Sequence, residues 1–186
     1  MSISEWLLAA LVVVLVLWVF QTFNGLVSRK NIVSEAWSGV ETQLKRRADL
    51  IPNLVETVKG YATHERVTFD ELARLRGAGQ GTQDVAQRSQ TEQMITAAIG
   101  KVMAVAEAYP QLRASENFQR LEKDLEDIEE QINLSRRYYN GSVRDFNTMI
   151  EQAPTNLIAN TFSFKPADFF QIEDPADRAV PKVSFS

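Results

Sequence analysis

The chain has 186 residues, with 20 Lys and Arg against 24 Asp and Glu, one His and no Cys. This length is enough for one hydrophobic core but short for two ordinary domains. Without Cys there can be no disulfide framework, thiolate nucleophile or Cys-built zinc site. A formal net charge of −4 argues against a nucleic-acid binder, because neutralising phosphates needs a basic surface.

The N-terminal end is a candidate membrane anchor. Residues 6–20 are all apolar, and the apolar stretch extends to Ile3 and Phe23. At 1.5 Å per residue, positions 3–23 cover roughly 30 Å, about one hydrocarbon core. A cleaved signal peptide and a buried oligomerisation helix are the alternatives, but residues 1–5 carry no Lys or Arg and no A-x-A site follows. We predict a transmembrane anchor over residues 1–23, represented by Trp6, Leu11, Val14, Leu17, Trp18 and Phe20.

The flanking charges predict an orientation. Glu5 is the only charged residue before the apolar run, whereas Arg29, Lys30 and then Lys45, Arg46 and Arg47 follow it. The positive-inside tendency places the N-terminus outside and the C-terminal body in the cytoplasm, in a single-pass arrangement with the lipid bilayer as partner.

Residues 24–160 show helical spacing of apolar residues throughout. The longest register runs from Phe118 through Leu125, Ile132 and Tyr139 to Met149. Asp49 and Pro52 favour a new helix start, the glycines of 77–81 a flexible connection, and Pro110 a helix end. The prediction is an all-α protein: a transmembrane helix continuous with an elongated antiparallel four-helix, coiled-coil-like bundle, with helices at about 3–47, 50–76, 82–109 and 115–151.

The C-terminal residues 161–186 form an aromatic segment and then a tail. Phe162, Phe164, Phe169 and Phe170 could lie in the membrane interface or pack back over the bundle, and packing back is the preferred interpretation. After Ile172, charges and prolines predict an exposed, mobile end.

Two long segments carry a family resemblance. QLKRRADLIPNLVETVKGYATHE (43–65) and NFQRLEKDLEDIEEQINLSRRYYNGSVRDFNTMIEQAPTNLIA (117–159) strongly resemble the LemA family of bacterial membrane-anchored helical proteins, and FNGLVSRKNIVSEAW (23–37) fits too. Departures are Ala48, where the family usually has an aromatic residue, and Ala153, where Phe is usual. The resemblance implies a transmembrane helix, a helical bundle in the bacterial plasma membrane and no established enzymatic activity.

The string Lys45-Arg46-Arg47-Ala48-Asp49 is the sharpest charge feature. It could bind an acidic partner or phosphate at a helix junction, where the N–H groups of the next helix would point outward. Alternatively, the cations pair with the six acidic residues of 122–130, and this pairing is the favoured interpretation. Lys45, Arg46 and Arg47 are therefore possible partner-binding residues.

Other motifs have a structural explanation. His64-Glu65 lacks the second His of a zinc-protease helix, so we expect an exposed His64 and no metal or other cofactor. GAGQG (77–81) is neither a P-loop nor a dinucleotide motif, and no EF-hand loop accompanies the acidic run. Arg136-Arg137-Tyr138-Tyr139 mixes cations and aromatics, but core packing explains it better than nucleic-acid binding.

Two functions are consistent with these features. The first is a membrane-anchored helical scaffold or structural homo-oligomer of the bacterial envelope, without catalytic activity. The second is a membrane-tethered sensor or adaptor that binds a protein partner through its helical body. An enzyme ranks a distant third, because no set of residues satisfies the geometry that catalysis needs.

Overall fold

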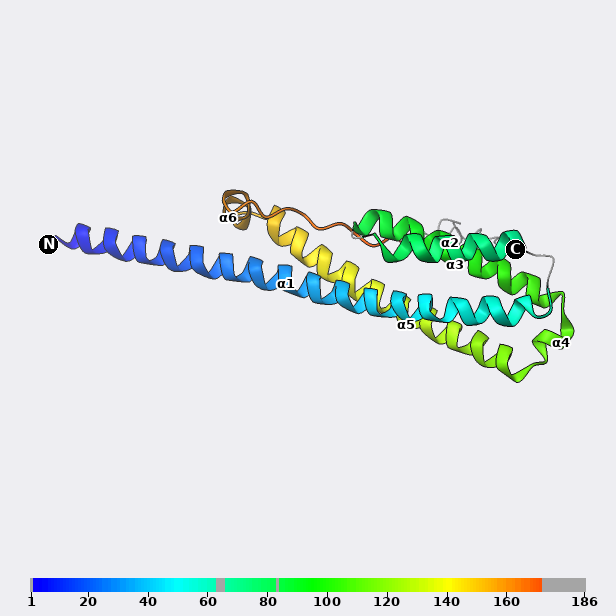
Figure 1. The fold of residues 1–186 in the computed structure, drawn as a ribbon. Coiled ribbons are helices and arrows are strands. Elements are labelled where there is room, and N and C mark those ends of the chain that lie inside the picture. The colour runs from blue at the N-terminus through cyan, green and yellow to red at the C-terminus, as the bar shows by residue number, and fades with distance from the viewer. Residues whose placement is uncertain (1, 63–65, 83, 172–186) are drawn as a thin grey trace, which may run out of the picture. The chain divides into compact units, whose positions relative to one another are not determined.

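The computed structural model describes residues 2–62, 66–82 and 84–171. Within these ranges all regular secondary structure is helical, which confirms the predicted all-α class. The elements are α1 (Ile3–Lys59), α2 (Arg66–Gln80), α3 (Val85–Glu107), α4 (Pro110–Arg113), α5 (Glu116–Glu151) and α6 (Thr155–Thr161) (Figure 1). The predictions for His64 and for the end of the chain after residue 171 lie outside the described residues.

The first helix does not end where the sequence predicted. Asp49 and Pro52 were expected to start a new helix, but α1 passes through both without interruption (Figure 1). Proline has no N–H to donate to the carbonyl of Ala48 four residues earlier. The Nε–H of Arg76 on α2 donates to that carbonyl at 2.7 Å instead. A contact from another helix thus supplies the hydrogen bond that Pro52 removes.

The glycine-rich connection was also predicted too early. Gly77 and Gly79 lie within α2, and of the three glycines only Gly81 follows the helix. A Cβ built at Gly79 would lie 3.3 Å from both Glu92 Oε1 and Ile95 Cδ1 on α3. The glycine therefore permits the close approach of α2 and α3, rather than a flexible turn.

The boundaries of α3 and α5 fall near their predicted positions. Asp84 caps α3 by accepting a hydrogen bond from the backbone N–H of Gln87 at 2.8 Å. Pro110 is the first residue of α4, where its missing N–H costs little. The hydroxyl of Ser115 accepts a hydrogen bond from the backbone N–H of Phe118 at 3.3 Å, so it caps α5.

The chain divides into two compact units. Unit 2 comprises residues 42–133 and, of the C-terminal part, the described residues 169–171. Its core takes apolar side chains from α1, α2, α3, α4 and α5, among them Leu54, Leu72, Val102, Leu112 and Leu125. Ala48 lies near Arg76 and Lys59 lies over Phe69, so α1 and α2 are antiparallel. Glu71 pairs with Lys101, while Gly79 lies beside Glu92, so α2 and α3 are antiparallel as well.

Unit 1 comprises residues 2–41 and 134–168 among those described. Gly25 of α1 lies against Met149 of α5, and the rings of Trp37 and Tyr139 contact each other in a tilted arrangement, with 5.2 Å between their centroids, so the two helices run antiparallel here. An ion pair joins Arg29 to Asp145 at 3.0 Å. After α6, the chain passes back along α5, where the side-chain amide of Asn147 exchanges two hydrogen bonds with the backbone of Ala167.

Candidate membrane anchor and charged sites

The apolar part of α1 is exposed in the structure. An 18-residue apolar window of this helix has none of its residues buried inside the protein. By length and composition, α1 is the one helix among the described residues able to cross a membrane. Trp6 and Phe20 are each 64% exposed; Leu11, Val14 and Leu17 are exposed too, and Trp18 is half-buried. Soluble monomers rarely expose so large a continuous apolar surface, so these side chains need an apolar environment from outside the chain.

Aromatic side chains gather in unit 1 just after this apolar stretch. The ring of Phe23 lies 4.8 Å from that of Phe162 and 5.8 Å from that of Phe164, between centroids. Phe146 lies 6.5 Å from Phe164. These rings line a groove with a volume of about 630 Å³, which we call the aromatic groove. Pockets that bind small ligands usually measure about 300 to 1,000 Å³. The aromatic groove is formed by Phe23, Val27, Lys30 and Asn31 of α1, by Phe146 of α5 and by residues 162–165.

The C-terminal aromatic residues pack back on the helices as far as the chain is described. Phe164 is half-buried in the aromatic groove, and Phe170 is fully buried, whereas Phe162 and Phe169 keep substantial exposure. Within unit 2, the hydroxyl of Ser89 on α3 donates to the carbonyl of Gln171, next to Phe170.

The predicted triplet Lys45-Arg46-Arg47 separates into two environments. Lys45 and Arg46 are exposed, and Lys45 pairs with Asp49 at 2.7 Å. Arg47 is 0% exposed, so its guanidinium is inside unit 2. The predicted helix junction at Asp49 is wrong, because α1 continues through it and no helix N-terminus is present there to bind phosphate. Partner binding by the triplet stays a prediction.

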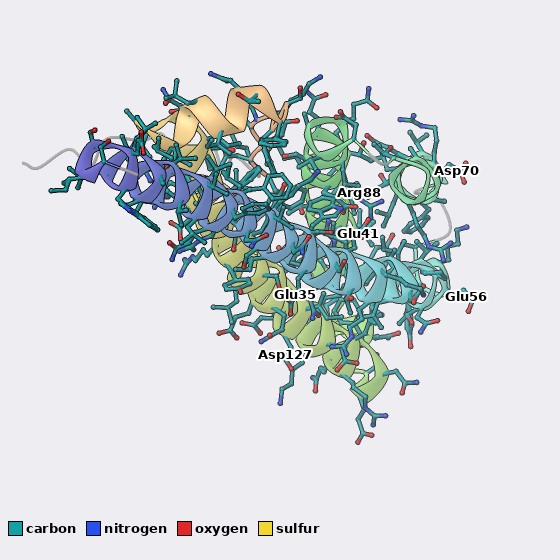
Figure 2. All side chains as sticks on the ribbon, turned by 90° about the vertical axis from the view of Figure 1, so that its left-hand side faces the viewer. Glu35, Glu41, Glu56, Asp70, Arg88 and Asp127 are labelled. Atoms are coloured by element: carbon teal, nitrogen blue, oxygen red, sulfur yellow. The ribbon has the colours of Figure 1, made fainter. Side chains whose placement is uncertain are left out.

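Arg47 is the centre of a buried ionic network. Its guanidinium donates to the carboxylate of Glu92 on α3, to Glu129 Oε1 on α5 at 2.5 Å and to Thr96 Oγ1 at 2.7 Å. Arg88 Nε lies 2.7 Å from the other oxygen of Glu92 as an ion pair. Two cations and two carboxylates therefore balance, as buried charges require. In Figure 2, Arg88 lies among the helices, whereas Glu56, Asp70 and Asp127, three exposed carboxylates of unit 2, lie on the outer side of theirs.

Sequence reasoning found only part of this network. Pairing of the cations with the acidic run was expected, and Glu129 belongs to that run. Glu92 was missed, although it lies three residues before Ile95 and so extends the apolar register of α3 by one position. A carboxylate on the buried face of a helix is a signal for an ionic partner in the core.

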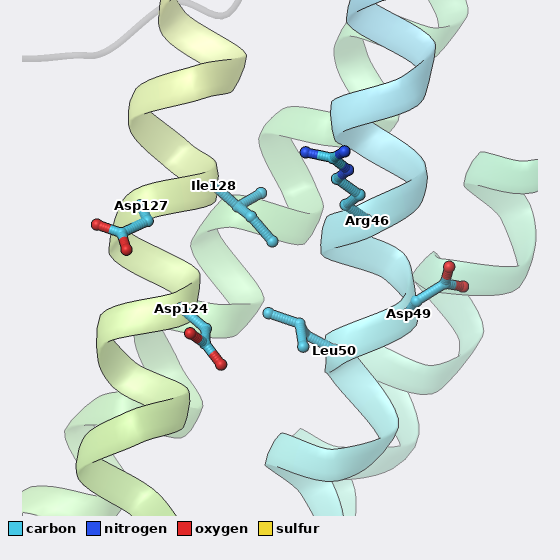
Figure 3. Close-up of a pocket in the computed structure, with 6 residues that line it drawn as sticks. All are labelled: Arg46, Asp49, Leu50, Asp124, Asp127 and Ile128. Carbon is cyan, nitrogen blue, oxygen red and sulfur yellow. The ribbon is translucent and has the colours of Figure 1, made fainter.

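Arg46 lines a shallow groove on the surface of unit 2. The groove has a volume of about 350 Å³ and is bordered by Leu50 of α1 and by Asp124, Asp127 and Ile128 of α5. Figure 3 shows Arg46 and Leu50 pointing toward α5, whereas Asp49 points away from it. The arrangement is a cation facing an acidic helix face, without the convergent groups of a catalytic site.

The Arg-Tyr string contributes to packing in unit 1. Tyr139 is buried against Trp37, and its hydroxyl donates to the carbonyl of Asp168 at 2.8 Å. Burial, with the nearby Asp168 carboxylate as a second cause, raises the pKa of Tyr139 to about 12. Among the described residues, no group of three acidic or His side chains is placed to hold a metal ion.

The helical fold and the exposed apolar stretch of α1 define a membrane-associated helical protein. Comparison with known proteins gives its family: the model of the LemA family matches residues 36–185. The chain belongs to the LemA family, as its sequence segments indicated.

Relatives of known name are similar over most of their length. Magnetosome protein MamQ 1 of Paramagnetospirillum magneticum is 25% identical over 195 residues, which cover 91% of this chain and 72% of the relative. Magnetosome protein MamQ of Magnetospirillum gryphiswaldense is 23% identical over 85% of this chain and 68% of the relative. Protein LemA of Metamycoplasma hominis is 25% identical over 81% of this chain and 69% of the relative. None of these names states an enzymatic activity.

Proposed function

We propose that this protein is a single-pass, membrane-anchored helical scaffold of the bacterial envelope that works as a homo-oligomer and has no catalytic activity. The observation that carries the proposal is the apolar window of α1, none of whose residues is buried inside the protein. In water this surface would drive aggregation, and in a bilayer it becomes the anchor. The well-packed core of unit 2 then provides a stable body at the membrane.

Self-association has a candidate surface on α5. Leu134 and Tyr138 lie one helical turn apart in unit 1 and are 49% and 61% exposed. An exposed apolar pair on a long helix is the kind of surface that coiled-coil partners cover. A second copy of the chain would bury both side chains.

Light scattering of the full chain in detergent tests this proposal. We expect a mass greater than that of one chain, and we expect Leu134→Ser with Tyr138→Ser to shift the protein toward the monomer. Val67→Ser on α2 is the matched control, because Val67 is exposed but lies in unit 2. A native protein that is strictly monomeric, or equal effects of both changes, would remove the basis for a homo-oligomeric scaffold.

The orientation has a separate test. We propose that the N-terminus is outside the plasma membrane and the body in the cytoplasm, supported by the charge bias between Glu5 and the cations after the apolar run. The chain has no Cys, so Ser2→Cys and Lys123→Cys give single labelling sites at exposed positions. An impermeant thiol reagent on intact spheroplasts should label only position 2. Labelling only at position 123 would reverse the orientation.

A second candidate function is an adaptor that binds an acidic protein partner through Lys45 and Arg46. The observation that favours it is their exposure beside the shallow groove of unit 2. Charge reversal of both residues should abolish recovery of the partner, whereas Lys123→Glu, at another exposed cation of this unit, should not. Unchanged recovery after reversal would eliminate this candidate.

A further inference from the structure

The aromatic groove lies at a defined position along α1. Phe23 follows Phe20, the last residue of the continuous apolar run, by three positions, or about 4.5 Å of helix rise. When residues 3–23 cross the hydrocarbon core, Phe23 is the last residue of the span, so the groove lies at the boundary between the acyl chains and the lipid headgroups. Aromatic side chains are typical of this interfacial region.

The groove combines an apolar wall with a cationic rim. The rings of Phe23, Phe162 and Phe164 form the wall, and Lys30 and Lys165 are the charged residues that line the groove. None of the residues that line the groove is acidic. Among the described residues, Lys30 and Lys165 are exposed and make no ion pair with a carboxylate, in contrast to the neighbouring Arg29. The rim is thus positively charged, and no carboxylate of the described residues neutralises it.

The backbone at the groove is held in an uncommon conformation. Ser163 has a φ of 57°, in the left-handed region that non-glycine residues rarely adopt. This turn directs the rings of both neighbours, Phe162 and Phe164, toward Phe23. Strain of this kind persists where the surrounding structure, and often a ligand site, fixes the backbone.

We propose that the aromatic groove binds one anionic phospholipid of the surrounding bilayer. The phosphate group contacts Lys30 and Lys165, and the upper part of an acyl chain lies on Phe23, Phe162 and Phe164. The volume of about 630 Å³ is within the usual range for a small-molecule site. A free phosphate would use the lysines but not the rings, whereas a lipid uses both. This inference rests on the proposed membrane anchoring, which places the groove at the boundary between the acyl chains and the headgroups.

The test measures lipid retained by the full chain in detergent. Phosphatidylglycerol and phosphatidylcholine with identical acyl chains are titrated, and mass spectrometry counts the lipids that remain on each protein. We expect saturable binding of one phosphatidylglycerol per chain, in preference to phosphatidylcholine. Lys30→Gln and Lys165→Gln should each weaken phosphatidylglycerol binding roughly fivefold, as expected for a cation at an anionic membrane surface. Phe162→Ala should weaken the binding of both lipids.

Matched controls separate a built site from general charge or apolar effects. Arg137→Gln with Arg144→Gln removes two exposed cations of unit 1 away from the groove, and Leu157→Ala removes an exposed apolar side chain of α6. Neither control should change binding. Equal loss in the control pair, equal retention of the two lipids, or displacement by inorganic phosphate at similar concentration would overturn the proposal.

The proposed lipid site and the proposed membrane anchor are tested by separate measurements. Binding is measured in detergent, where the apolar part of α1 is already covered. The fraction of native and variant protein found in cell membranes is measured separately, and the groove variants should remain there. Loss of the native chain from membranes would contradict the proposed anchoring, whereas the lipid counts alone decide the groove.

Discussion

The hydrogen bond from Arg76 to Ala48 predicts a specific dependence on Pro52. Ala48 is buried, so replacing Arg76 with Met leaves its carbonyl without the donor that lies at 2.7 Å. An unsatisfied buried carbonyl costs about 1–3 kcal/mol. In a Pro52→Ala background, the new backbone N–H of residue 52 can donate to the same carbonyl. The cost of Arg76→Met should therefore fall by about 1–2 kcal/mol in that background.

Urea unfolding of the four proteins of this cycle, followed by helical circular dichroism in a fixed concentration of detergent, measures the coupling. Arg74→Met on the same helix is the control, because Arg74 is exposed, and its cost should stay within about 0.5 kcal/mol in both backgrounds. The reasoning would be refuted if Arg76→Met lowered the free energy of unfolding by the same amount in the Pro52 and the Pro52→Ala backgrounds, or by the same amount as Arg74→Met.

Three other predictions follow from the packing of the two units. Arg47→Met should lower the free energy of unfolding by about 3–5 kcal/mol, because it leaves the buried carboxylate of Glu92 without its partner. The control Lys45→Met breaks an exposed pair and should lower the free energy of unfolding by less than about 0.5 kcal/mol. Equal urea midpoints for the two variants would contradict this difference. Because the pKa of Tyr139 is raised from 10.0 to about 12, its contribution to stability is complete below pH 10 and is lost as the pH rises through 12. Melting temperatures across that range should fall less for Tyr139→Phe than for the native protein, and parallel curves would contradict the assignment. Gly77→Ala should stabilise α2 by about 0.5–1 kcal/mol. Gly79→Ala should give no such gain, because its Cβ would lie 3.3 Å from side-chain atoms of α3. Equal gains in thermal stability for the two variants would contradict this prediction.

Local sequence signals were sufficient for the helical class, for the exposed apolar stretch and, within about three residues, for the predicted starts of α3 near residue 82 and of α5 near residue 115. These features depend on residues close together in the chain: apolar spacing, caps and a continuous apolar run. The buried register of α5 also follows from spacing, and Phe118, Leu125, Ile132 and Tyr139 are all buried as that pattern predicted.

The features that sequence reasoning missed depend on partners far along the chain. Pro52 is a helix breaker by local rules, and only Arg76, on another helix, satisfies the carbonyl that it leaves unpaired. The glycines of α2 have the composition of a loop, but Gly79 is required by the side chains of α3. Arg47 has several possible acidic partners in the sequence, and the choice of Glu92 and Glu129 depends on how three helices pack.

The core of unit 2 and the aromatic groove of unit 1 use residues from different parts of the sequence, so they can form only in a certain order during synthesis. The core cluster of unit 2 uses residues from Ile51 to Leu125, so all of its members have been translated well before the chain is finished. The aromatic groove joins Phe23 to Phe164 and cannot close until the later residue has left the ribosome. The apolar start of α1 leaves the ribosome before the residues of the core cluster and of the groove. Insertion into the membrane at that stage would shield this apolar stretch from water. Unit 2 can then fold before Phe164 and its neighbours are available to complete the aromatic groove around Phe23.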